Sequence, residues 1–245
     1  MDALTISAAS GMKARMESLE MLANNIANQS SAGYKADREF YSLYSAPEAS
    51  PGGVVDPPLL PVIEKHWTDF SQGTLNETGD PLHLAIDGKG FFTVSTAGGT
   101  LYTRNGNFHF GEGGQLSTQE GFAVLDAGGK AVLLNTQQPV EFTNSGQIKQ
   151  AGVVVGQLGL VEFGQPETLA KHSGTYFQMN ETGEKPTAST RASLHQGKLE
   201  VANYSPAESA VRLVSLLRQF EMLQKAIQIG SEMGRRADEV ARVGS

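Results

Sequence analysis

Apolar or small side chains recur along the first part of the chain at spacings of three and four residues. Such spacing places the side chains along one side of an α-helix, as in a coiled-coil-like row. A cluster of turn-forming residues follows at 28–33, and its Gly33 suits the left-handed conformation that ends many helices. The pattern predicts a helix from residue 1 to about residue 28. Its row consists of Ala9, Met12, Met16, Leu19, Ala23 and Ile26.

A second helix is predicted at the other end of the chain. Ser205 suits the N-cap, Pro206 the first helical position and Glu208 the third, which together form a capping box. A row of alternating three- and four-residue steps follows, bulky at first and then small. It consists of Leu213, Leu216, Phe220, Leu223, Ile227, Gly230, Gly234 and Ala237.

The length of this second helix indicates its partner. About 35 residues would extend roughly 50 Å at 1.5 Å per residue, which exceeds the usual globular helix. A row of that length cannot be buried against a small β domain alone, so the N-terminal helix is the expected partner.

Short strands are predicted between the two helices. The segments 91–94 and 101–104 flank Ala97-Gly98-Gly99, which predicts a β-hairpin. More strands follow at roughly ten-residue spacing, which favours a meandering sandwich or a barrel-like domain. They are expected at 122–125, 131–134, 140–143, 153–155 and 158–163.

Half of the ten prolines lie within residues 45–62, where they block helix and central strand. We therefore expect an extended linker region there. The resulting fold class is α+β, with a discontinuous, coiled-coil-like helical domain built from both chain ends and a central β-rich domain. The expected divisions are 1–35 for the N-terminal helix, 36–74 for the linker, 75–200 for the β domain and 201–245 for the C-terminal helix.

Charge and composition exclude several classes of function. The net charge is −7 and Lys and Arg are not clustered, so no nucleic-acid partner is expected. Cysteine is absent, which excludes disulfides and thiolate metal sites. The sequence has neither a membrane-spanning apolar run nor a cleavable signal. We expect no membrane insertion, and either a cytosolic chain or one exported without cleavage of a signal.

Catalytic and cofactor motifs are not evident. The five histidines are widely scattered, so no metal site is expected. Gly88-Lys89-Gly90 resembles the start of a dinucleotide loop, but the third glycine is missing and a turn is expected instead. The single tryptophan, Trp67, is expected to be a packing anchor. We predict a protein that is not an enzyme and has no cofactor.

Several longer motifs resemble those of the flagellar hook–basal-body rod protein family. The segment 22–28, Leu-Ala-Asn-Asn-Ile-Ala-Asn, precedes Gly33-Tyr34-Lys35, as in the family's N-terminal signature, although Ser31 stands where the family often has Thr. Residues 78–94, 102–108 and 121–125 resemble the central β domain of rod and hook subunits. Residues 196–200, Asn203, 218–221 and 225–228 resemble the C-terminal signature.

The resemblance implies a structural subunit of the bacterial flagellar basal-body rod. Such subunits leave the cell through the flagellar type III export apparatus, without a cleaved signal, and polymerise with themselves and with other rod and hook subunits. Their terminal helices form an inner tube within the periplasmic drive shaft. Length favours a proximal-rod over a distal-rod subunit or a longer hook-type subunit. The implied assembly residues are the two helical rows together with Asn24, Asn25 and Asn28.

Two interpretations from other classes stay open at this point. The β domain could capture a carbohydrate or a surface partner while the helices only oligomerise the chain; an exposed aromatic groove would favour this. Alternatively, turn carboxylates could serve a hydrolase as a glycosidase pair. The candidate carboxylates are Asp80, Asp87, Glu112 and Glu120.

Overall fold

The computed structural model describes residues 3–45, 59–180, 183 and 185–243. The chain forms two compact units, and each draws on more than one stretch of sequence. Unit 1 comprises residues 1–26, 37–67 and 205–245, whereas unit 2 comprises residues 27–36 and 68–204. The helices lie in unit 1 and most of the strands lie in unit 2, so the predicted α+β class is confirmed.

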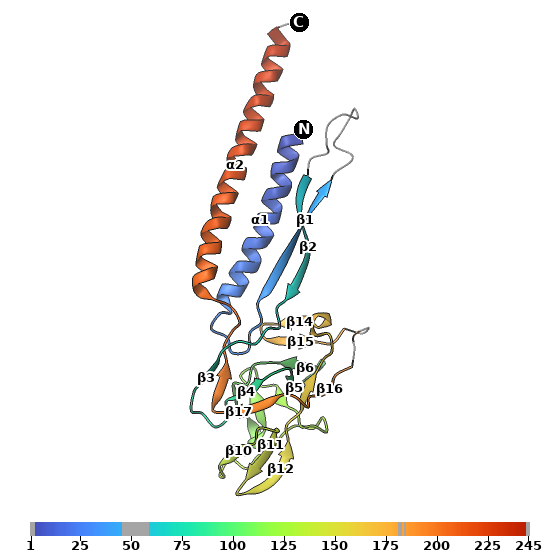
Figure 1. The fold of residues 1–245 in the computed structure, drawn as a ribbon, viewed down its shortest axis with the longest axis vertical. Helices are drawn as coiled ribbons and strands as arrows, with labels where there is room; N and C mark the ends of the chain where they lie inside the picture. The colour runs from blue at the N-terminus through green and yellow to red at the C-terminus, as the bar shows by residue number, and fades with distance from the viewer. Residues whose placement is uncertain (1–2, 46–58, 181–182, 184, 244–245) are drawn as a thin grey trace. The chain divides into compact units, whose positions relative to one another are not determined.

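Unit 1 contains two long helices, α1 (Ala3–Ala27) and α2 (Pro206–Val243). They run side by side in opposite directions, which brings the N- and C-terminal ends of the chain to the same end of this unit (Figure 1). The start of α2 agrees with the predicted cap, because the Ser205 hydroxyl accepts a hydrogen bond from the Glu208 N–H at 3.4 Å. Among the described residues, neither α1 nor α2 has the hydropathy that a membrane-spanning helix needs.

The region predicted to be an extended linker, 36–74, contributes to both units. Its strands β1 (Asp37–Ser45) and β2 (Leu59–Thr68) pair in a two-stranded sheet within unit 1. The proline-rich core of the predicted linker, 46–58, lies outside the described residues. Strand pairing at its flanks was missed because β1 and β2 meet across that segment rather than through a short turn signal.

Unit 2 is built from short strands, and its recorded strand pairs are antiparallel. A nine-stranded sheet and a three-stranded sheet form most of it, and two strand pairs complete it. The strands of the nine-stranded sheet are β5 (Phe91–Thr96), β6 (Gly99–Thr103), β7 (Phe108–Phe110), β8 (Leu116–Thr118), β9 (Ala123–Val124), β13 (Leu160–Glu162), β14 (Ala170–Ser173), β15 (Tyr176–Gln178) and β16 (Thr187–Ala188). The three-stranded sheet has β10 (Val140–Phe142), β11 (Gln147–Gln150) and β12 (Val153–Gln157). The two pairs join β3 (Leu75–Glu77) to β18 (Lys198–Glu200) and β4 (Leu84–Asp87) to β17 (Ser193–Gln196).

The predicted hairpin is confirmed, since β5 and β6 pair from Phe92↔Thr103 to Thr96↔Gly99. A purely meandering order is wrong, because strands near the end of unit 2 return to pair with strands at its beginning. Thus β17 pairs with β4, and β18 pairs with β3. Even spacing along the sequence indicates how many strands there are, but it does not indicate which distant strands pair.

Candidate functional site

A buried network of three charged side chains lies in unit 2. The Glu200 carboxylate receives the Lys35 Nζ at 2.6 Å on Oε1 and the Arg104 Nε at 2.9 Å on Oε2. The side chains of Lys35, Arg104 and Glu200 are 1%, 4% and 0% exposed. An ion network so completely removed from water is tolerated only where further hydrogen bonds complete it.

Backbone groups supply those further hydrogen bonds. The Arg104 guanidinium also donates to the carbonyls of Gly88 and Gly90, at 2.9 and 2.7 Å, while the Gly73 N–H donates to Glu200 Oε1 at 2.9 Å. Lys35 Nζ donates to the Ser71 carbonyl at 2.6 Å. The network therefore fixes the backbone of several loops around one carboxylate. Burial lowers the pKa of Lys35 below its ordinary value, against the opposing effect of the Glu200 charge.

Two glycines allow this close approach. Gly33 has a φ of +67°, and a Cβ added there would lie 2.3 Å from the Arg104 carbonyl carbon. A Cβ added to Gly106 would lie 1.7 Å from the Leu84 carbonyl oxygen. Both distances are far below van der Waals contact, so only glycine fits at these positions.

The network joins the segment that follows α1 to the segment that precedes α2. The Gly33 N–H donates to the Glu200 carbonyl at 2.7 Å, and the Ala36 N–H donates to Asn203 Oδ1 at 2.9 Å. Asn203 in turn donates its Nδ2 to the Asp69 carbonyl at 2.6 Å. The segment that follows α1 and the segment that precedes α2 are thereby fastened to each other within unit 2.

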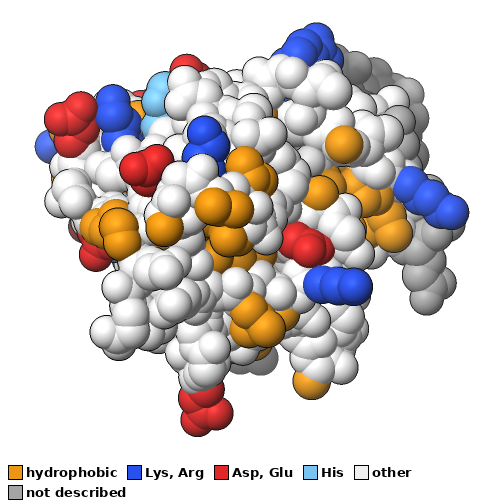
Figure 2. Space-filling view, turned by 90° about the horizontal axis from the view of Figure 1, so that it is seen from below, with side chains coloured by type: hydrophobic (Ala, Val, Ile, Leu, Met, Phe, Trp, Pro, Cys, Tyr) orange, Lys and Arg blue, Asp and Glu red, His pale blue; other side chains and the backbone are white. Residues whose placement is uncertain are grey.

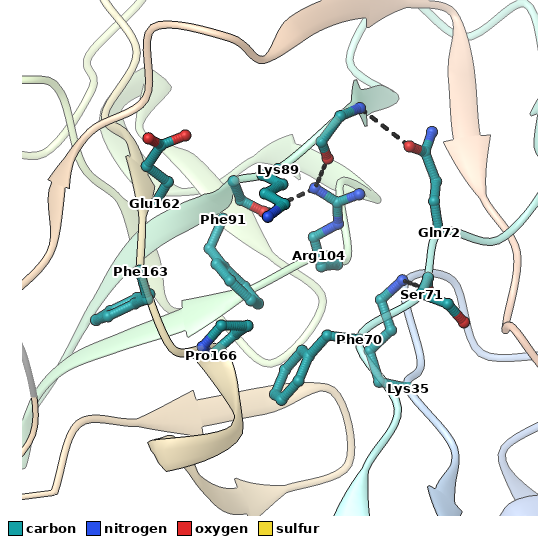
Figure 3. A pocket seen from close by; sticks show the side chains of 12 residues that line it. Lys35, Phe70, Ser71, Gln72, Lys89, Phe91, Arg104, Glu162, Phe163 and Pro166 are labelled. Atoms are coloured by element: carbon teal, nitrogen blue, oxygen red, sulfur yellow. Dashed lines mark hydrogen bonds between the residues drawn. The ribbon is translucent and has the colours of Figure 1, made fainter.

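A cavity of about 290 Å³ opens beside the network (Figure 3). Lys35 and Arg104 line it together with three phenylalanines. Both cationic groups are already engaged by Glu200 and by backbone carbonyls, as the dashed lines in Figure 3 partly show. We therefore assign these cations to holding the fold rather than to chemistry on a ligand. The phenylalanines are Phe70, Phe91 and Phe163.

The predicted row of α1 differs from the row that the structure buries. Of the predicted positions, Met16 is 50% exposed and Ala23 is also exposed, while Met12, Leu19 and Ile26 are half-buried. The buried row is displaced by one or two residues. It consists of Gly11, Ala14, Ser18, Leu22 and Asn25. Two adjacent rows share the three–four spacing, and within one chain the row with the smaller side chains is the buried one. The predicted assembly role of the other row stays a prediction.

The three asparagines implied by the resemblance lie in different surroundings. Asn25 is buried within unit 1, where its side-chain amide exchanges two hydrogen bonds with the backbone of Asp37, at 2.8 and 3.0 Å. Asn24 is exposed and Asn28 is half-buried. Asn25 therefore fastens the end of α1 to the start of β1.

The predicted row of α2 is the one that the structure turns inward. Leu216 is 4% exposed and Gly230 is buried, whereas Gly234 is exposed and the side chain of Ala237 lies outside the described residues. The remaining members, Leu213, Phe220, Leu223 and Ile227, are half-buried. An ion pair between Arg212 and Glu39 at 2.5 Å also ties α2 to β1.

A second apolar row on α2 stays exposed, and sequence reasoning missed it. We call it the outer row. Its members are 73%, 50%, 62%, 56% and 62% exposed in chain order, and they are Val211, Val214, Met222, Ile229 and Met233. If Arg218 and Lys225 are included, successive positions of the outer row are three or four residues apart. The sequence therefore contained the periodicity that places this row on one face of the helix.

The side chains considered for catalysis make separate contacts, and Asp87 is the last residue of β4. Asp80 accepts a hydrogen bond from the Leu82 N–H at 2.8 Å, and Asp87 accepts one from Gln72 Nε2 at 3.1 Å. Glu120 accepts the Tyr176 hydroxyl, and Glu112 lies in a short 3₁₀ turn. In the described part of the chain no group of three His, Cys, Asp or Glu residues could hold a metal ion. Trp67, which was expected to be a packing anchor, is 38% exposed and so buries the larger part of its surface.

Three family models match successive parts of the chain. Residues 7–35 match the flagella basal body rod protein model, and residues 85–156 match the flagellar hook protein FlgE/F/G D1 domain. Residues 195–240 match the flagellar basal body rod FlgEFG protein C-terminal model. Each matched segment contributes one member of the buried network, namely Lys35, Arg104 and Glu200.

Curated relatives match nearly the whole chain. It is 34% identical to a flagellar basal-body rod protein FlgF of Caulobacter vibrioides, over 97% of both chains. A FlgF protein of Mesorhizobium japonicum is 30% identical over 83% of both chains. A FlgG protein of Bacillus subtilis is 28% identical over 91% of this chain and 93% of its own.

Proposed function

The chain belongs to the flagellar basal-body rod protein family of the FlgF and FlgG type, and on that premise we propose how it works within the rod. It is a structural subunit of the flagellar basal body and assembles with other axial subunits. We assign it to the proximal rod, as a FlgF-like subunit that polymerises through its terminal helices and transmits torque. The identity of 34% with the FlgF protein of Caulobacter vibrioides, against 28% with the FlgG protein of Bacillus subtilis, supports this position.

The observation that carries the proposal is the outer row of α2. Five large apolar side chains lie exposed on one helix face, while the opposite row is turned into unit 1. An exposed apolar stripe of this length on a soluble chain marks a protein interaction surface. On α1, Met16 and Ala23 supply exposed positions of the same kind. Neighbouring subunits would cover both helices in a coiled-coil-like inner tube.

The buried network supports the same function in a different way. A torque-bearing subunit must transmit force between its helices and its β domain without slipping. The network fastens the segments that leave α1 and enter α2 through Glu200, Gly33 and Asn203. Because all three charged side chains are paired and buried, removing one of them would leave a buried charge without its full counter-charge.

Export completes the proposal. The subunit would pass through the flagellar type III export apparatus as an unfolded chain and keep its N-terminal helix after export. Mass spectrometry of the subunit from purified basal bodies tests this step. A subunit that keeps residues 3–27 agrees with the proposal, whereas a subunit trimmed within that range contradicts it.

Substitution of an outer-row residue tests the assembly role most directly. Met222→Asp places a charge on an exposed position, so the isolated chain should fold normally while rod formation fails. Glu221→Asp, at the neighbouring exposed position, is the matched control and should leave rods intact. Electron microscopy of basal bodies from cells that produce each variant as their only copy gives the result. Normal rods with Met222→Asp would exclude the outer row as an assembly surface.

The FlgG relative keeps a distal-rod position as the second candidate. Antibody labelling of the subunit along isolated basal bodies separates the two. Label at the end of the rod nearest the cytoplasmic membrane supports the proximal assignment, and label along the distal part overturns it.

A further inference from the structure

The strand β12 lies at the outer edge of the three-stranded sheet of unit 2. The sheet has the order β10-β11-β12, and β12 pairs with β11 alone. Among the residues that the structure describes, no strand pairs with its second edge, and only its last carbonyl, that of Gln157, accepts a backbone hydrogen bond there, from the Ala127 N–H at 2.9 Å. Backbone N–H and C=O groups along such an edge favour the addition of one more extended strand.

The side chains of β12 are unusual for an edge strand. Val153, Val154 and Val155 are 65%, 52% and 50% exposed. Successive strand residues point to opposite faces, so apolar side chains are exposed on both faces of β12. Protein edges are usually protected by charges or proline. Residues 150–161 contain neither, so this edge has no such protection.

The turn that leads into β12 is strained. Ala151 has a φ of +50° and Gly152 a φ of +78°, and they form the two-residue loop between the paired residues Gln150 and Val153. Both central residues of such a turn require positive φ, a conformation that alanine adopts at a cost. The β11–β12 register also shifts between Ile148 and Lys149. Bulges and strained turns of this kind commonly re-aim a strand at a functional site.

The surroundings of this hairpin leave room for a partner. A Cβ added at Gly152 would have no heavy atom within 4 Å. Figure 2 views the molecule from the end at which β10, β11 and β12 lie in Figure 1, and hydrophobic side chains gather in patches over this face.

We propose that β12 is a docking strand, to which an edge strand of a second copy of this chain adds in the assembled protein. The free backbone edge selects an extended segment rather than a helix or a small molecule. Each copy carries a net charge of −7, so copies repel one another except where they meet through uncharged surface. The exposed, uncharged segment 151–157 provides that surface, and pairing would cover part of its three valines.

This contact is separate from the helical one. It lies in unit 2, whereas the outer row of α2 lies in unit 1. It rests on the proposed function only because a rod brings copies of the chain together. The β12 contact therefore adds a lateral link between β domains to the packing of the helices.

The test uses the full-length chain over a series of concentrations, with sedimentation velocity for association and hydrogen exchange for the β12 amides. With rising concentration the wild-type chain should associate, and exchange at 153–157 should slow at least tenfold. Val154→Lys places a charge on the edge and should raise the concentration needed for association at least tenfold. The matched control is Leu133→Lys, the same type of change at a 67% exposed position of unit 2 outside β12, and it should leave association and the slowing at β12 intact. Val211→Lys, on the outer row of α2, is the comparison for the helical contact and should leave the slowing at β12 intact. Circular dichroism melting checks that all three variants keep the wild-type fold.

The outcomes separate the two proposals. A wild-type chain that does not associate, or that associates while exchange at β12 is unchanged, overturns the docking strand. Association that is lost with Val211→Lys but kept with Val154→Lys assigns the contact to the helices, which contradicts the docking strand and leaves the proposed function intact. Protection of β12 in purified basal bodies but not in the associated pure chain assigns the strand to a different subunit and also overturns the second-copy assignment.

Discussion

The two units of this chain bury their apolar residues to very different extents. In unit 2 a continuous core runs through the sheets, and Leu84, Phe92 and Leu116 within it are each 0% exposed. In unit 1 the two helices bury one narrow row each and leave large apolar side chains exposed, with Val211 at 73%. Unit 2 is complete by itself, apart from the edge at β12. Unit 1 leaves an apolar row of α2 exposed, which under the proposed function neighbouring subunits would cover.

This difference teaches how stability and assembly are divided along one chain. A domain with a closed core folds whether or not neighbours are present, because its apolar burial is internal. Long helices with little tertiary contact are marginal alone and gain most of their stability from packing. In this chain the closed core lies mainly within residues 68–204, whereas the exposed apolar row lies in the unit that contains both terminal helices.

Breaking the buried network should produce the largest loss of stability. Glu200→Ala leaves Lys35 and Arg104 buried without their counter-charge, which should lower the free energy of unfolding by about 3–5 kcal/mol. Glu112→Ala, at an exposed turn, is the control and should change stability little. Urea denaturation of unit 2, followed by the fluorescence of its tyrosines, measures the difference. Equal midpoints for the two variants would show that the network does not hold the unit together.

A pair of adjacent leucines sharpens the contrast within α2. Leu216 is 4% exposed and Leu217 is 45% exposed. Leu216→Ala should remove most of the helical structure of unit 1 in the isolated chain, because truncation of a buried leucine costs about 2–5 kcal/mol and unit 1 has little stability of its own. Leu217→Ala should be much milder in the isolated chain. Thermal unfolding followed by the helical signal in circular dichroism compares them, and equal losses would contradict the burial of one row only.

The smallest predicted effect concerns the turn before β12. Ala151→Asn should stabilise unit 2 by about 0.5–1 kcal/mol, because Asn-Gly suits a turn with two positive φ angles. Ala151→Val should destabilise it by about 1–2 kcal/mol, since a branched side chain tolerates positive φ poorly. Denaturation midpoints of both variants should therefore lie on opposite sides of the wild-type value. If both variants shifted the midpoint in the same direction, the positive φ angle of Ala151 would be contradicted.

Local patterns predicted much of this fold. Helix α1 was expected to end near residue 28 and ends at Ala27, and α2 begins at Pro206 after the expected Ser205 cap. The β5–β6 hairpin was likewise predicted from its glycine turn. These features depend on residues a few positions apart, which is the range over which periodicity and turn chemistry carry information.

Local patterns could not predict contacts between residues that are far apart in the sequence. Lys35 and Glu200 are 165 positions apart, and Arg104 and Glu200 are 96 apart. The motifs that contain them were recognised as family signatures, but their residue types alone do not indicate that they meet. The pairing of β18 with β3 was missed for the same reason. On α1, two rows with the same period could not be separated without knowing the packing partner.

Hydrogen exchange of the same chain, free in solution and in purified basal bodies, compares the two units in one experiment. The core strands β4, β5 and β6 should be equally protected in both states. Helices α1 and α2 should exchange quickly in the free chain and become strongly protected in the rod. Helices already as protected in the free chain as in the basal body would contradict the claim that neighbouring subunits complete unit 1.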